Sequence, residues 1–465
     1  MLKKIIIFFI VFFVLAIGAL VAIPFVFKDK INVLLKEQIN NELKVSVDYS
    51  DYGLTILSSF PDFKFLLSDL VVIGQGNFAG DTLAMMKELN FNLDAMKMYQ
   101  DKELKIHSIY IDELNLKTYV LADSTNSFDV LKDKPAVAST KIDTSSESLI
   151  NMNFESLIVK NSNIFYQNDL TNQILLLTDV NIDAGAEYQD EKADIEGHSQ
   201  IKELIFLSDS SNMEVDLKNI ELDIEGTYFE DKFTFDLTNL VSDLTYESKS
   251  SNQVLAIKNV EIVVLGDFID NNLNVTTKSN LASTNFTQEE TKFLNNTKIS
   301  LDGAINADLT NKAYTFIQNK LSLNDLVLNY DGKVNLPTEA IALDLKFNTE
   351  QSTFKELLSI IPEKYLKDYK DTKVEGEFNL NGFVKGSYTE NSLPDFNIEM
   401  GIDEGYFKNN ALPTAVENIN LKVSIKSANN KMDVDIPNAL VTVAGEPINF
   451  NLKMLDVQND PFVDL

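Results

Sequence analysis

Few side chains in this sequence have the chemistry of an enzyme site. Cysteine is absent, so the chain has neither a disulfide framework nor thiolate chemistry. The forty positive charges are all lysines, and His107 and His198 are the side chains that titrate near neutral pH. His107 lies between Ile106 and Ser108, where an ordinary strand residue is a simpler interpretation than a metal ligand.

Carboxylates are abundant, but their spacing does not point to a reaction. The run Asp190-Glu191…Asp194…Glu196 has the oxygen ligands that Ca²⁺ prefers, but it lacks the EF-hand pattern, so we predict a solvated strand face. Pairs of carboxylates occur throughout so acidic a chain and therefore carry no glycosidase signal. Nucleophile-elbow, zinc-protease, phosphate-loop and dinucleotide motifs are missing. We predict a non-enzymatic protein with no catalytic residue, metal site or cofactor.

The charge balance excludes one class of partner. The formal net charge is −30, and no arginine is present to bind phosphates in a bidentate manner. A chain of this kind lacks the basic surface that nucleic-acid binding requires, so we predict no nucleic-acid partner.

The apolar run from Ile5 to Phe27 is the strongest single element of the sequence. A helix of this length is roughly 34 Å long, which is enough to cross a hydrocarbon core of about 30 Å. A cleaved signal peptide is the main alternative and a buried core helix is a further one. The run is longer than a signal peptide requires, and it continues through Pro24 where a cleavage site would be expected. We predict a transmembrane anchor within residues 1–30.

The lysines that flank this run give a slight indication of orientation. Lys3 and Lys4 precede it, and Lys28 and Lys30 follow it, so the positive-inside rule only weakly favours a cytoplasmic N-terminus. The strongly acidic remainder is repelled by an anionic cytoplasmic leaflet. We therefore predict a single-pass protein of the bacterial inner membrane with most of its chain in the periplasm.

Two later segments have helical spacing. Apolar residues in 31–43 recur at the intervals of a short amphipathic helix that leaves the membrane surface. The segment 354–369 has the same spacing, and Pro362 divides it. We expect this second helix to plug or cap one end of a sheet.

Most of the remaining chain alternates apolar and polar residues. Ile220, Leu222 and Ile224 alternate with acidic residues, and similar runs continue toward the C-terminus. Residues 230–232 and 270–272 predict turns, and Asp331-Gly332 is a hairpin signal. Strands with one apolar and one polar face are typical of a one-sided antiparallel sheet.

One pair of segments suggests an internal repeat. Residues 104–119 read as two short strands joined by a tight turn, and 109–119 align with 157–167, matching apolar residues to apolar residues. Between them, residues 122–148 are rich in Ser, Thr, Asp and Lys and predict a flexible linker or loop.

So much one-sided sheet could form a row of sandwiches, a closed barrel or a long bent sheet. Sandwiches would show more glycine and proline punctuation, and an N-terminal anchor disfavours an outer-membrane barrel. We predict a mainly β protein: a transmembrane helix, then a long curved antiparallel sheet that forms a groove, with a few short amphipathic helices.

Short motifs near both ends carry a family resemblance. The N-terminal set is Phe60-Pro61-Asp62-Phe63, Leu66-Leu67-Ser68-Asp69-Leu70, Asp81-Thr82-Leu83-Ala84, Phe91-Asn92-Leu93 and then 106–116. The C-terminal set is Gly386-Ser387-Tyr388, Leu393-Pro394-Asp395-Phe396, Gly405-Tyr406-Phe407, Leu412-Pro413 and Glu417-Asn418-Ile419. In this order the motifs resemble AsmA-like proteins of Bacteroidetes-type bacteria, whose N-terminal region is related to the chorein-type ends of bridge-like lipid-transfer proteins.

The resemblance implies an organisation and a function. It implies a chorein/AsmA-like region at 31–121 and a repetitive β-groove at 149–465, which we expect to be truncated because relatives continue for further strands. It implies an inner-membrane-anchored periplasmic protein that carries phospholipid along an apolar groove between the inner and outer membranes and supports outer-membrane assembly. The partners would be membrane phospholipids, the inner membrane through residues 5–27, and envelope proteins. A membrane-tethered, non-enzymatic structural or interaction scaffold of the envelope is the alternative.

Overall fold

The computed structural model of the chain describes Lys36, Asn40 and the residue ranges 43–55, 63–93, 104–130, 150–151, 155–189, 191–337, 340–350, 352–361, 372–389, 392–410, 412–458 and 461–465. These residues are mainly β-strand, which confirms the predicted fold class at that level. Within these ranges we find no helix that is both long and apolar enough to span a bilayer. The predicted anchor at 5–27 and residues 131–148 of the predicted linker lie outside the described residues.

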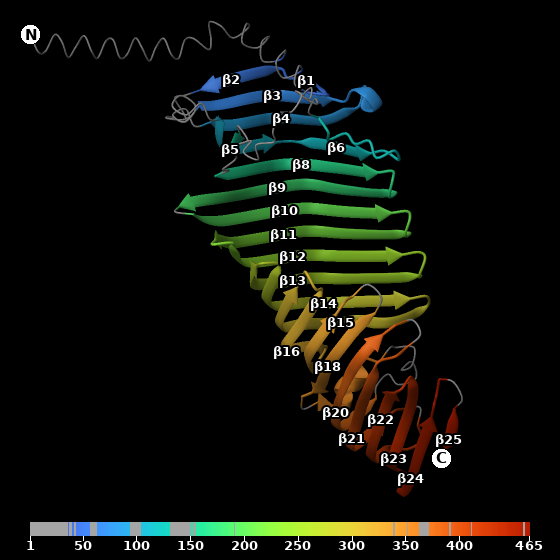
Figure 1. Cartoon of the computed structure of the whole chain (residues 1–465). Helices are drawn as coiled ribbons and strands as arrows, with labels where there is room; N and C mark the ends of the chain where they lie inside the picture. The colour runs from blue at the N-terminus through green and yellow to red at the C-terminus, as the bar shows by residue number, and fades with distance from the viewer. Residues whose placement is uncertain are drawn as a thin grey trace, which may run out of the picture. The chain divides into compact units, whose positions relative to one another are not determined.

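The chain divides into two compact units, residues 1–188 with 195–212 and residues 189–194 with 213–465. Figure 1 labels most of their strands. The strands of the first unit are β1 (Ser46–Asp48), β2 (Asp51–Thr55), β3 (Phe63–Ile73), β4 (Thr82–Leu93), β5 (Leu104–Asp112), β6 (Asn115–Val120), β7 (Ile150–Asn151), β8 (Ser156–Asn168) and most of β9 (Gln173–Gln189). A 3₁₀ turn, η1 (Gly76–Phe78), separates β3 from β4, and β10 (Lys192–Ser208) has residues in both units. Strands β1 and β2 pair with β3, and β3 with β4, all antiparallel.

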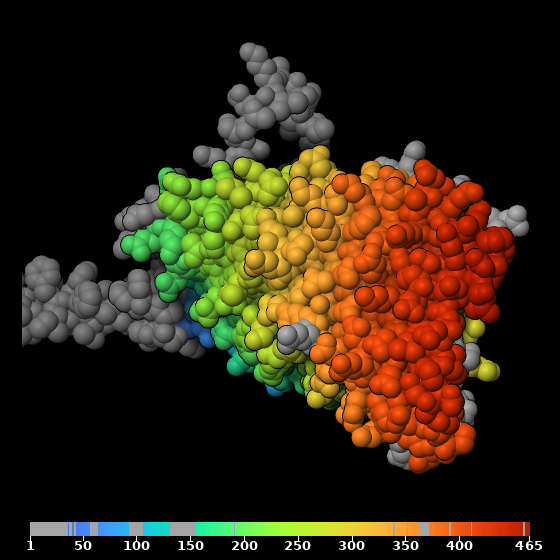
Figure 2. Space-filling view, turned by 90° about the horizontal axis from the view of Figure 1, so that it is seen from below, coloured from blue at the N-terminus to red at the C-terminus, as the bar shows by residue number. Residues whose placement is uncertain are grey.

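The second unit is a succession of antiparallel strands. They are β11 (Met213–Phe229), β12 (Lys232–Ser248), β13 (Gln253–Ile269), β14 (Asn272–Gln288), β15 (Thr291–Asp308), β16 (Ala313–Leu323), β17 (Leu326–Asn335), β18 (Ile341–Thr349), β19 (Ser352–Thr353), β20 (Lys373–Tyr388), β21 (Asp395–Lys408), β22 (Val416–Ala428), β23 (Lys431–Val443), β24 (Glu446–Leu455) and β25 (Phe462–Asp464). From β11 to β18 each strand pairs with the next, and β18 and β19 both pair with β20. Strands β20 to β25 continue the order and face the viewer in Figure 2 in orange and red.

Residues 104–119 form the two predicted short strands, β5 and β6, but no tight turn folds one strand back on the other. Strands β5 and β6 both pair with β8 in the parallel direction, so this part of the sheet is not antiparallel as predicted. The reason is a bend at Glu113 (φ 50°), whose N–H donates to Lys160 O at 3.0 Å and keeps the chain beside β8. The partners include the residues that the sequence comparison aligned: Ile109 with Leu157, Ile111 with Val159, and Leu116 with Ile164. The similarity of the two segments therefore belongs to neighbouring strands that run in the same direction.

Two of the three predicted turns are confirmed. Glu230-Asp231 joins β11 to β12 and Asp270-Asn271 joins β13 to β14, each with both residues in the left-handed region that a tight hairpin requires. The hairpin predicted at Asp331-Gly332 is wrong, because β17 runs straight through it. The Asp331 carboxylate instead accepts a hydrogen bond from the backbone N–H of Gln318 on the neighbouring strand.

Left-handed residues also stand in the middle of strands. Each has φ between 48° and 52°, and most are Asn or Asp, the non-glycine types that tolerate this region best. They are Asp69, Asn161, Asp179, Asn219, Asn259, Asn296, Gln318, Glu404 and Asn418. Because a single left-handed residue interrupts the extended backbone, each of them bends its strand.

These bends coincide with a change of phase in the sequence. In β11, Leu217 lies before Asn219 and Ile220 directly after it. In an uninterrupted strand, residues three apart point to opposite faces. The left-handed residue rotates the chain so that both apolar series can face the same side. The same change occurs at Asp179 in β9 and at Asn259 in β13.

The register of β11 and β12 is unbroken across the bend at Asn219. Lys218 pairs with Asp243 and Ile220 with Val241, so the pairing continues across the bend without an inserted residue. The Asn219 side-chain amide donates to Ser242 Oγ at 2.9 Å on the next strand. Ile220 and Val241, with 8% and 6% of their surfaces exposed, form the start of a buried row beside the bends.

Substitutions at Asn219 test whether its backbone conformation is required. A β-branched residue pays about 1–2 kcal/mol to adopt the left-handed region, whereas glycine adopts it freely. We expect Asn219→Val to lower the free energy of unfolding in urea by about 1–2 kcal/mol and Asn219→Gly to change it by less than about 0.5 kcal/mol. Ser242→Ala is the control, since it removes the hydrogen-bond partner and leaves φ unchanged. Equal losses for the Val and Gly variants would contradict the requirement.

Candidate functional site

The two sides of the sheet in the second unit differ in chemistry. We call the side that carries Ile224, Leu237 and Val264 the apolar face, since these residues are successive register partners, and we call the opposite side the outer face. One cross-strand row of the apolar face is Gly226, Phe235, Gly266, Val275, Ile305, Phe316, Gly332, Leu345, Val384, Phe396, Ser427 and Met432. The adjacent row of the outer face is Thr227, Thr234, Asp267, Asn274, Asn306, Thr315, Lys333, Asp344, Lys385 and Asp395.

Two further rows of the apolar face lie closer to the bends. The first is Leu222, Asn239, Ile262, Ser279, Leu301, Leu321, Leu328 and Thr349. The second is Ile220, Val241, Val260, Leu281, Ile299, Leu323 and Leu326. None of the three rows contains a charged side chain. The apolar face is therefore uncharged along all three rows from β11 to β17 and along the first row as far as β23.

The protein covers this surface only in part. In the row that contains Phe235, every residue except Ser427 is only half-buried, and full burial is concentrated beside the bends, as at Ile220 and Val260. A folded core would bury such residues almost completely. Apolar patches of more than a few hundred Å² are rare on soluble monomers and indicate a ligand or partner. The half-buried apolar face is the candidate functional site.

Glycines on this face lie beneath phenylalanine rings of neighbouring strands. A Cβ added at Gly226 would come within 2.6 Å of Cε2 and Cζ of the Phe233 ring, and one at Gly382 within 2.7 Å of Phe347 Cζ. The rings of Phe233 and Phe235 are 5.6 Å apart and nearly parallel, at 21°. Because the glycines have no side chain, these rings can lie across the strands. The face then presents flat aromatic surface and keeps the space above it free.

The helix predicted at 354–369 begins as expected. Helix α4 (Phe354–Ser359) has a capping box between Thr353 and Glu356, and most of the predicted second half lies outside the described residues. Phe354, Leu357 and Ile360 pack against Leu326, Phe378 and Ile402. These contacts place α4 on the apolar face along β17, β20 and β21. The expectation that it plugs or caps one end of a sheet is therefore wrong. Within the second unit, α4 packs on strands that lie in the middle of the strand order, since β22 to β25 follow them.

The first unit, in contrast, has a core of its own. Residues from β1 to β4 and η1 form a buried cluster: Val45, Val47, Tyr49, Tyr52, Leu67, Leu70, Phe78 and Leu83. Leu121 and Val130, both in the segment that follows β6, pack against this cluster, and Lys44 N–H donates to Val130 O at 2.7 Å. At these strands the protein covers the apolar side of the sheet with its own residues.

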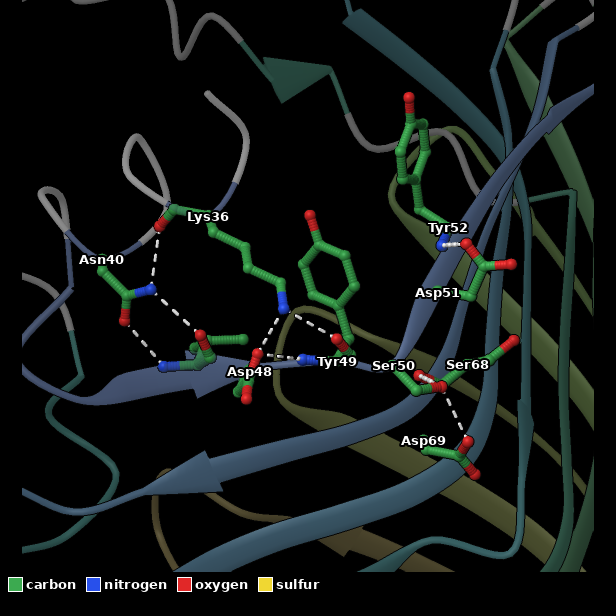
Figure 3. A network of polar contacts seen from close by, with 10 residues as sticks. Lys36, Asn40, Asp48, Tyr49, Ser50, Asp51, Tyr52, Ser68 and Asp69 are labelled. Carbon is green, nitrogen blue, oxygen red and sulfur yellow. Dashed lines mark hydrogen bonds and ion pairs between the residues drawn. The ribbon is translucent and has the colours of Figure 1, made fainter. Parts of the chain in front are cut away.

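A polar network attaches the segment before β1 to this core (Figure 3). Lys36 and Asn40 are helical, and both side chains reach the edge of the sheet. The Asn40 side chain donates to Val47 O at 2.9 Å and accepts from Val47 N–H at 2.7 Å, as a neighbouring strand would. The Lys36 ammonium donates to Asp48 Oδ1 at 2.5 Å and to Tyr49 O at 2.8 Å, and lies 4.6 Å from the centre of the Tyr49 ring.

This network extends to the first bend of the sheet. Ser50 Oγ donates to Asp69 Oδ2 at 2.7 Å, and Asp69 is the left-handed residue of β3. The Lys36 hydrogen bond, followed by that of the Tyr49 N–H, lowers the pKa of the Asp48 carboxyl below its ordinary value of 3.8. Burial raises the pKa of the Tyr49 hydroxyl. The segment that follows the predicted anchor is thus attached to the start of the sheet.

The residues considered for chemistry in the sequence do not come together. His107 Nδ1 lies 2.6 Å from Glu155 Oε1, and the Glu155 N–H donates to His107 O at 2.8 Å, so His107 joins two adjacent strands. Asp194 accepts from Lys192 and from Thr227, each at 2.6 Å, while Asp190 lies outside the described residues. Nowhere in the described part of the chain do three His, Asp or Glu side chains gather as they would around a metal ion.

The comparison with protein families agrees with the fold. The sequence profile of the AsmA family matches residues 1–365, which include the first unit and β11 to β19 of the second. The chain belongs to the AsmA family. No curated protein and no solved structure matches it. The predicted resemblance to AsmA-like proteins is thereby confirmed at the level of the family, and the C-terminal motifs at 386–419 lie beyond the matched residues.

Three features were not predicted from the sequence: the bends, the glycine–phenylalanine contacts and the Lys36–Asn40 network. The bends have a readable signal: an apolar residue, any residue, Asn or Asp, and an apolar residue, with the alternation changing phase across the four. Leu67-Ser68-Asp69-Leu70, Leu217-Lys218-Asn219-Ile220 and Ile257-Lys258-Asn259-Val260 are examples. The contacts between neighbouring strands have no such signal, because they depend on register.

Gly226 provides a test of the aromatic surface. Gly226→Ala brings Cβ against the Phe233 ring, which must move, and we expect the free energy of unfolding in urea to fall by about 1–2 kcal/mol. Phe233→Leu should remove most of this penalty in the double variant, because it removes the ring that clashes. Gly53→Ala, whose nearest atom is at 3.7 Å, is the control and should have little effect. Additive losses in the double variant would show that the ring is not the obstacle.

The Lys36 network predicts a pH-dependent attachment. Since the folded-state pKa of Asp48 is lowered, the Lys36–Asp48 contact stabilises the fold above pH 3.8 and is lost as the pH falls through the folded value. Asp48 is exposed, so we expect only about 0.2–0.5 kcal/mol from this pair. Lys36→Met should lower the hydrogen-exchange protection of β1 near neutral pH and have a smaller effect below pH 3. Lys87→Met, which breaks the exposed 2.7 Å pair with Glu113, should leave β1 unchanged.

Proposed function

We propose that this AsmA-family protein carries phospholipid along an apolar groove between the inner and outer membranes and thereby supports outer-membrane assembly. The aligned bends curl the sheet so that its apolar face lines the groove. The observation that carries the proposal is that this face is uncharged along three rows of register partners. In the two rows farther from the bends, nearly every residue is only half-buried. Acyl chains are the natural cover for such a face, since they offer apolar surface without a polar group that needs a hydrogen bond.

The place of the protein in the envelope belongs to the same proposal. Residues 5–27 anchor the chain in the inner membrane as a single span, and the rest of the chain lies in the periplasm. The Lys36–Asn40 network supports this arrangement, because it ties the segment after the anchor to the first strand of the sheet. Membrane phospholipids are the cargo, and proteins of the envelope supply or receive it.

The main alternative is a membrane-tethered scaffold of the cell envelope. Two observations favour it: α4 covers part of the apolar face with Phe354, Leu357 and Ile360, and a core closes the sheet of the first unit. A scaffold needs no free apolar surface, whereas a conduit does. Direct detection of lipid on the face therefore separates the two functions.

Photo-crosslinking in cells that produce the full chain provides this detection. A benzophenone amino acid at Phe235 lies on the apolar face, and one at Thr234 on the outer face, one residue away. We expect intact phospholipid adducts, identified by mass spectrometry, at position 235 and essentially none at position 234. No adduct at 235 or at other apolar-face positions would favour the scaffold.

A charge on the apolar face should interrupt transport. Ile224→Asp places a carboxylate among half-buried apolar residues, where desolvation of the charge costs several kcal/mol if lipid covers it. We expect adduct formation at Phe235 to fall about tenfold or more and the permeability of the outer membrane to rise. Thr234→Asp, on the exposed outer face, is the matched control and should change neither quantity. Unchanged permeability in a folded Ile224→Asp protein would count against a conduit.

A further inference from the structure

The bends divide strands of the second unit into arms of unequal length. In β11, six residues precede Asn219 and ten follow it, and β13 is divided in the same way at Asn259. At about 3.3 Å per residue, the arm that follows the bend is roughly 13 Å longer than the arm that precedes it. We call the edge of the sheet at the turns 230–231, 270–271 and 309–312 the long-arm edge, and the edge at the turns 249–252 and 289–290 the short-arm edge.

The apolar face reaches the long-arm edge without a polar border. The residues two positions beyond the row that contains Phe235 lie on the same face, because side chains alternate along a strand. They form a further row of register partners that contains no charged or amide side chain: Tyr228, Phe233, Phe268, Leu273, Ala307, Tyr314, Val334, Leu343 and Gly386. Large side chains in this row or just beyond it have exposed fractions of 36% to 46%: Tyr228, Phe268, Leu309, Leu336, Ile341 and Tyr388. The apolar surface is therefore uncovered at this edge.

The short-arm edge ends in a different kind of row. The last register partners there are mostly polar: Met213, Ser248, Gln253, Gln288 and Thr291. Ser248 is buried, and its hydroxyl accepts a hydrogen bond from Ser251 Oγ at 2.8 Å. The row before it is half-buried: Val215, Tyr246, Leu255 and Phe286. Among the described residues of these rows, large apolar side chains are thus exposed at the long-arm edge and not at the short-arm edge.

The size of the exposed strip indicates what covers it. From β11 to β20 the further row is roughly 40 Å long at about 4.8 Å per strand, and the extra length of the long arms makes the strip roughly 13 Å wide. The resulting area of roughly 500 Å² is well below the roughly 800 Å² that each partner buries in a standard protein interface. An acyl chain, in contrast, is about 15 Å long, half of a hydrocarbon core of about 30 Å, and matches the width of the strip. The size therefore favours acyl chains over a second protein.

We propose that phospholipid lies on the long arms with its acyl chains parallel to the strands, its methyl ends toward the bends and its ester end at the long-arm edge. This inference rests on the proposed function and adds the orientation of the cargo. Tyr228 has the arrangement that this orientation requires, since its ring belongs to the apolar row and its hydroxyl donates to Asp231 in the turn at 2.9 Å. Tyrosine is common where an apolar surface meets water, which is where the ester end of a phospholipid lies. The headgroup then stays in water beyond the turn, where its charge is not desolvated.

Fluorescence quenching in the full chain tests this orientation. The chain has no cysteine, so a single introduced cysteine carries a bimane fluorophore at one position. We compare Phe268→Cys at the long-arm edge with Val264→Cys, which lies four residues nearer the bend on the same face of β13. The vesicles contain phosphatidylcholine with a nitroxide near either the ester end or the methyl end of one acyl chain. We expect the ester-end nitroxide to quench more strongly at 268, and the methyl-end nitroxide at 264, each by about twofold, because the two positions are roughly 13 Å apart along the strand.

Leu265→Cys is the matched control, because Leu265 is an apolar, exposed residue of the same strand on the outer face and should be quenched by neither lipid. The reverse order of quenching, or equal quenching by both lipids at 264 and 268, would overturn the orientation and leave lipid transport in place. Quenching at 264 alone would also overturn it, because lipid then does not cover the edge, and a blue-shifted bimane emission at 268 would identify a protein surface, such as a second copy, as the cover. No quenching at either position would instead overturn the proposed function.

Discussion

The left-handed residues within the strands are the constraint on which the rest of the structure depends. A strand that bends must still keep its apolar residues on one side, and an extended chain cannot change the phase of its alternation without turning over. A single left-handed residue, such as Asn219, both bends the strand and keeps its apolar residues on one side. The register continues without a shift across the bends at Asn219 and Asn259, and it shifts near the bends at Asn296 and Gln318. The row of partners beside the bends, from Ile220 to Leu326, is nevertheless continuous.

The character of the candidate site follows from this alignment. Since every strand of the second unit turns the same series inward, the apolar face has no charge in the three rows described above, and the charges fall on the outer face and the turns. Glycine beneath phenylalanine keeps bulky rings close to the strands, so the surface is broad and smooth. The site is distinguished by its apolar surface area and by the absence of charged side chains along these rows. Residue types associated with catalysis are therefore of little use in finding it.

Both units are built of strands with one apolar side, but this side is covered differently in the two units. In the first unit, Tyr49, Tyr52 and Phe78 complete a core, and the sheet is covered by the chain itself. In the second unit, the equivalent surface is half-buried, and α4 covers only the part around Phe378. The parallel pairing of β5 and β6 with β8 is a further difference, since the pairs of successive strands from β11 to β18 are antiparallel.

The sequence by itself determined the β class, the one-sided strands, the turns at Glu230-Asp231 and Asp270-Asn271 and the family, because alternation and turn chemistry are local properties. Its division into regions at residues 30, 121 and 148 stays a prediction. Only the tertiary structure decided that 109–119 and 157–167 lie side by side in parallel, that Asp331-Gly332 lies inside a strand, and that α4 packs on the apolar face. In each of these cases the deciding partner is a residue on another strand. A short motif such as Asp-Gly has one local preference, and the hydrogen bonds and packing of its neighbours outweigh it.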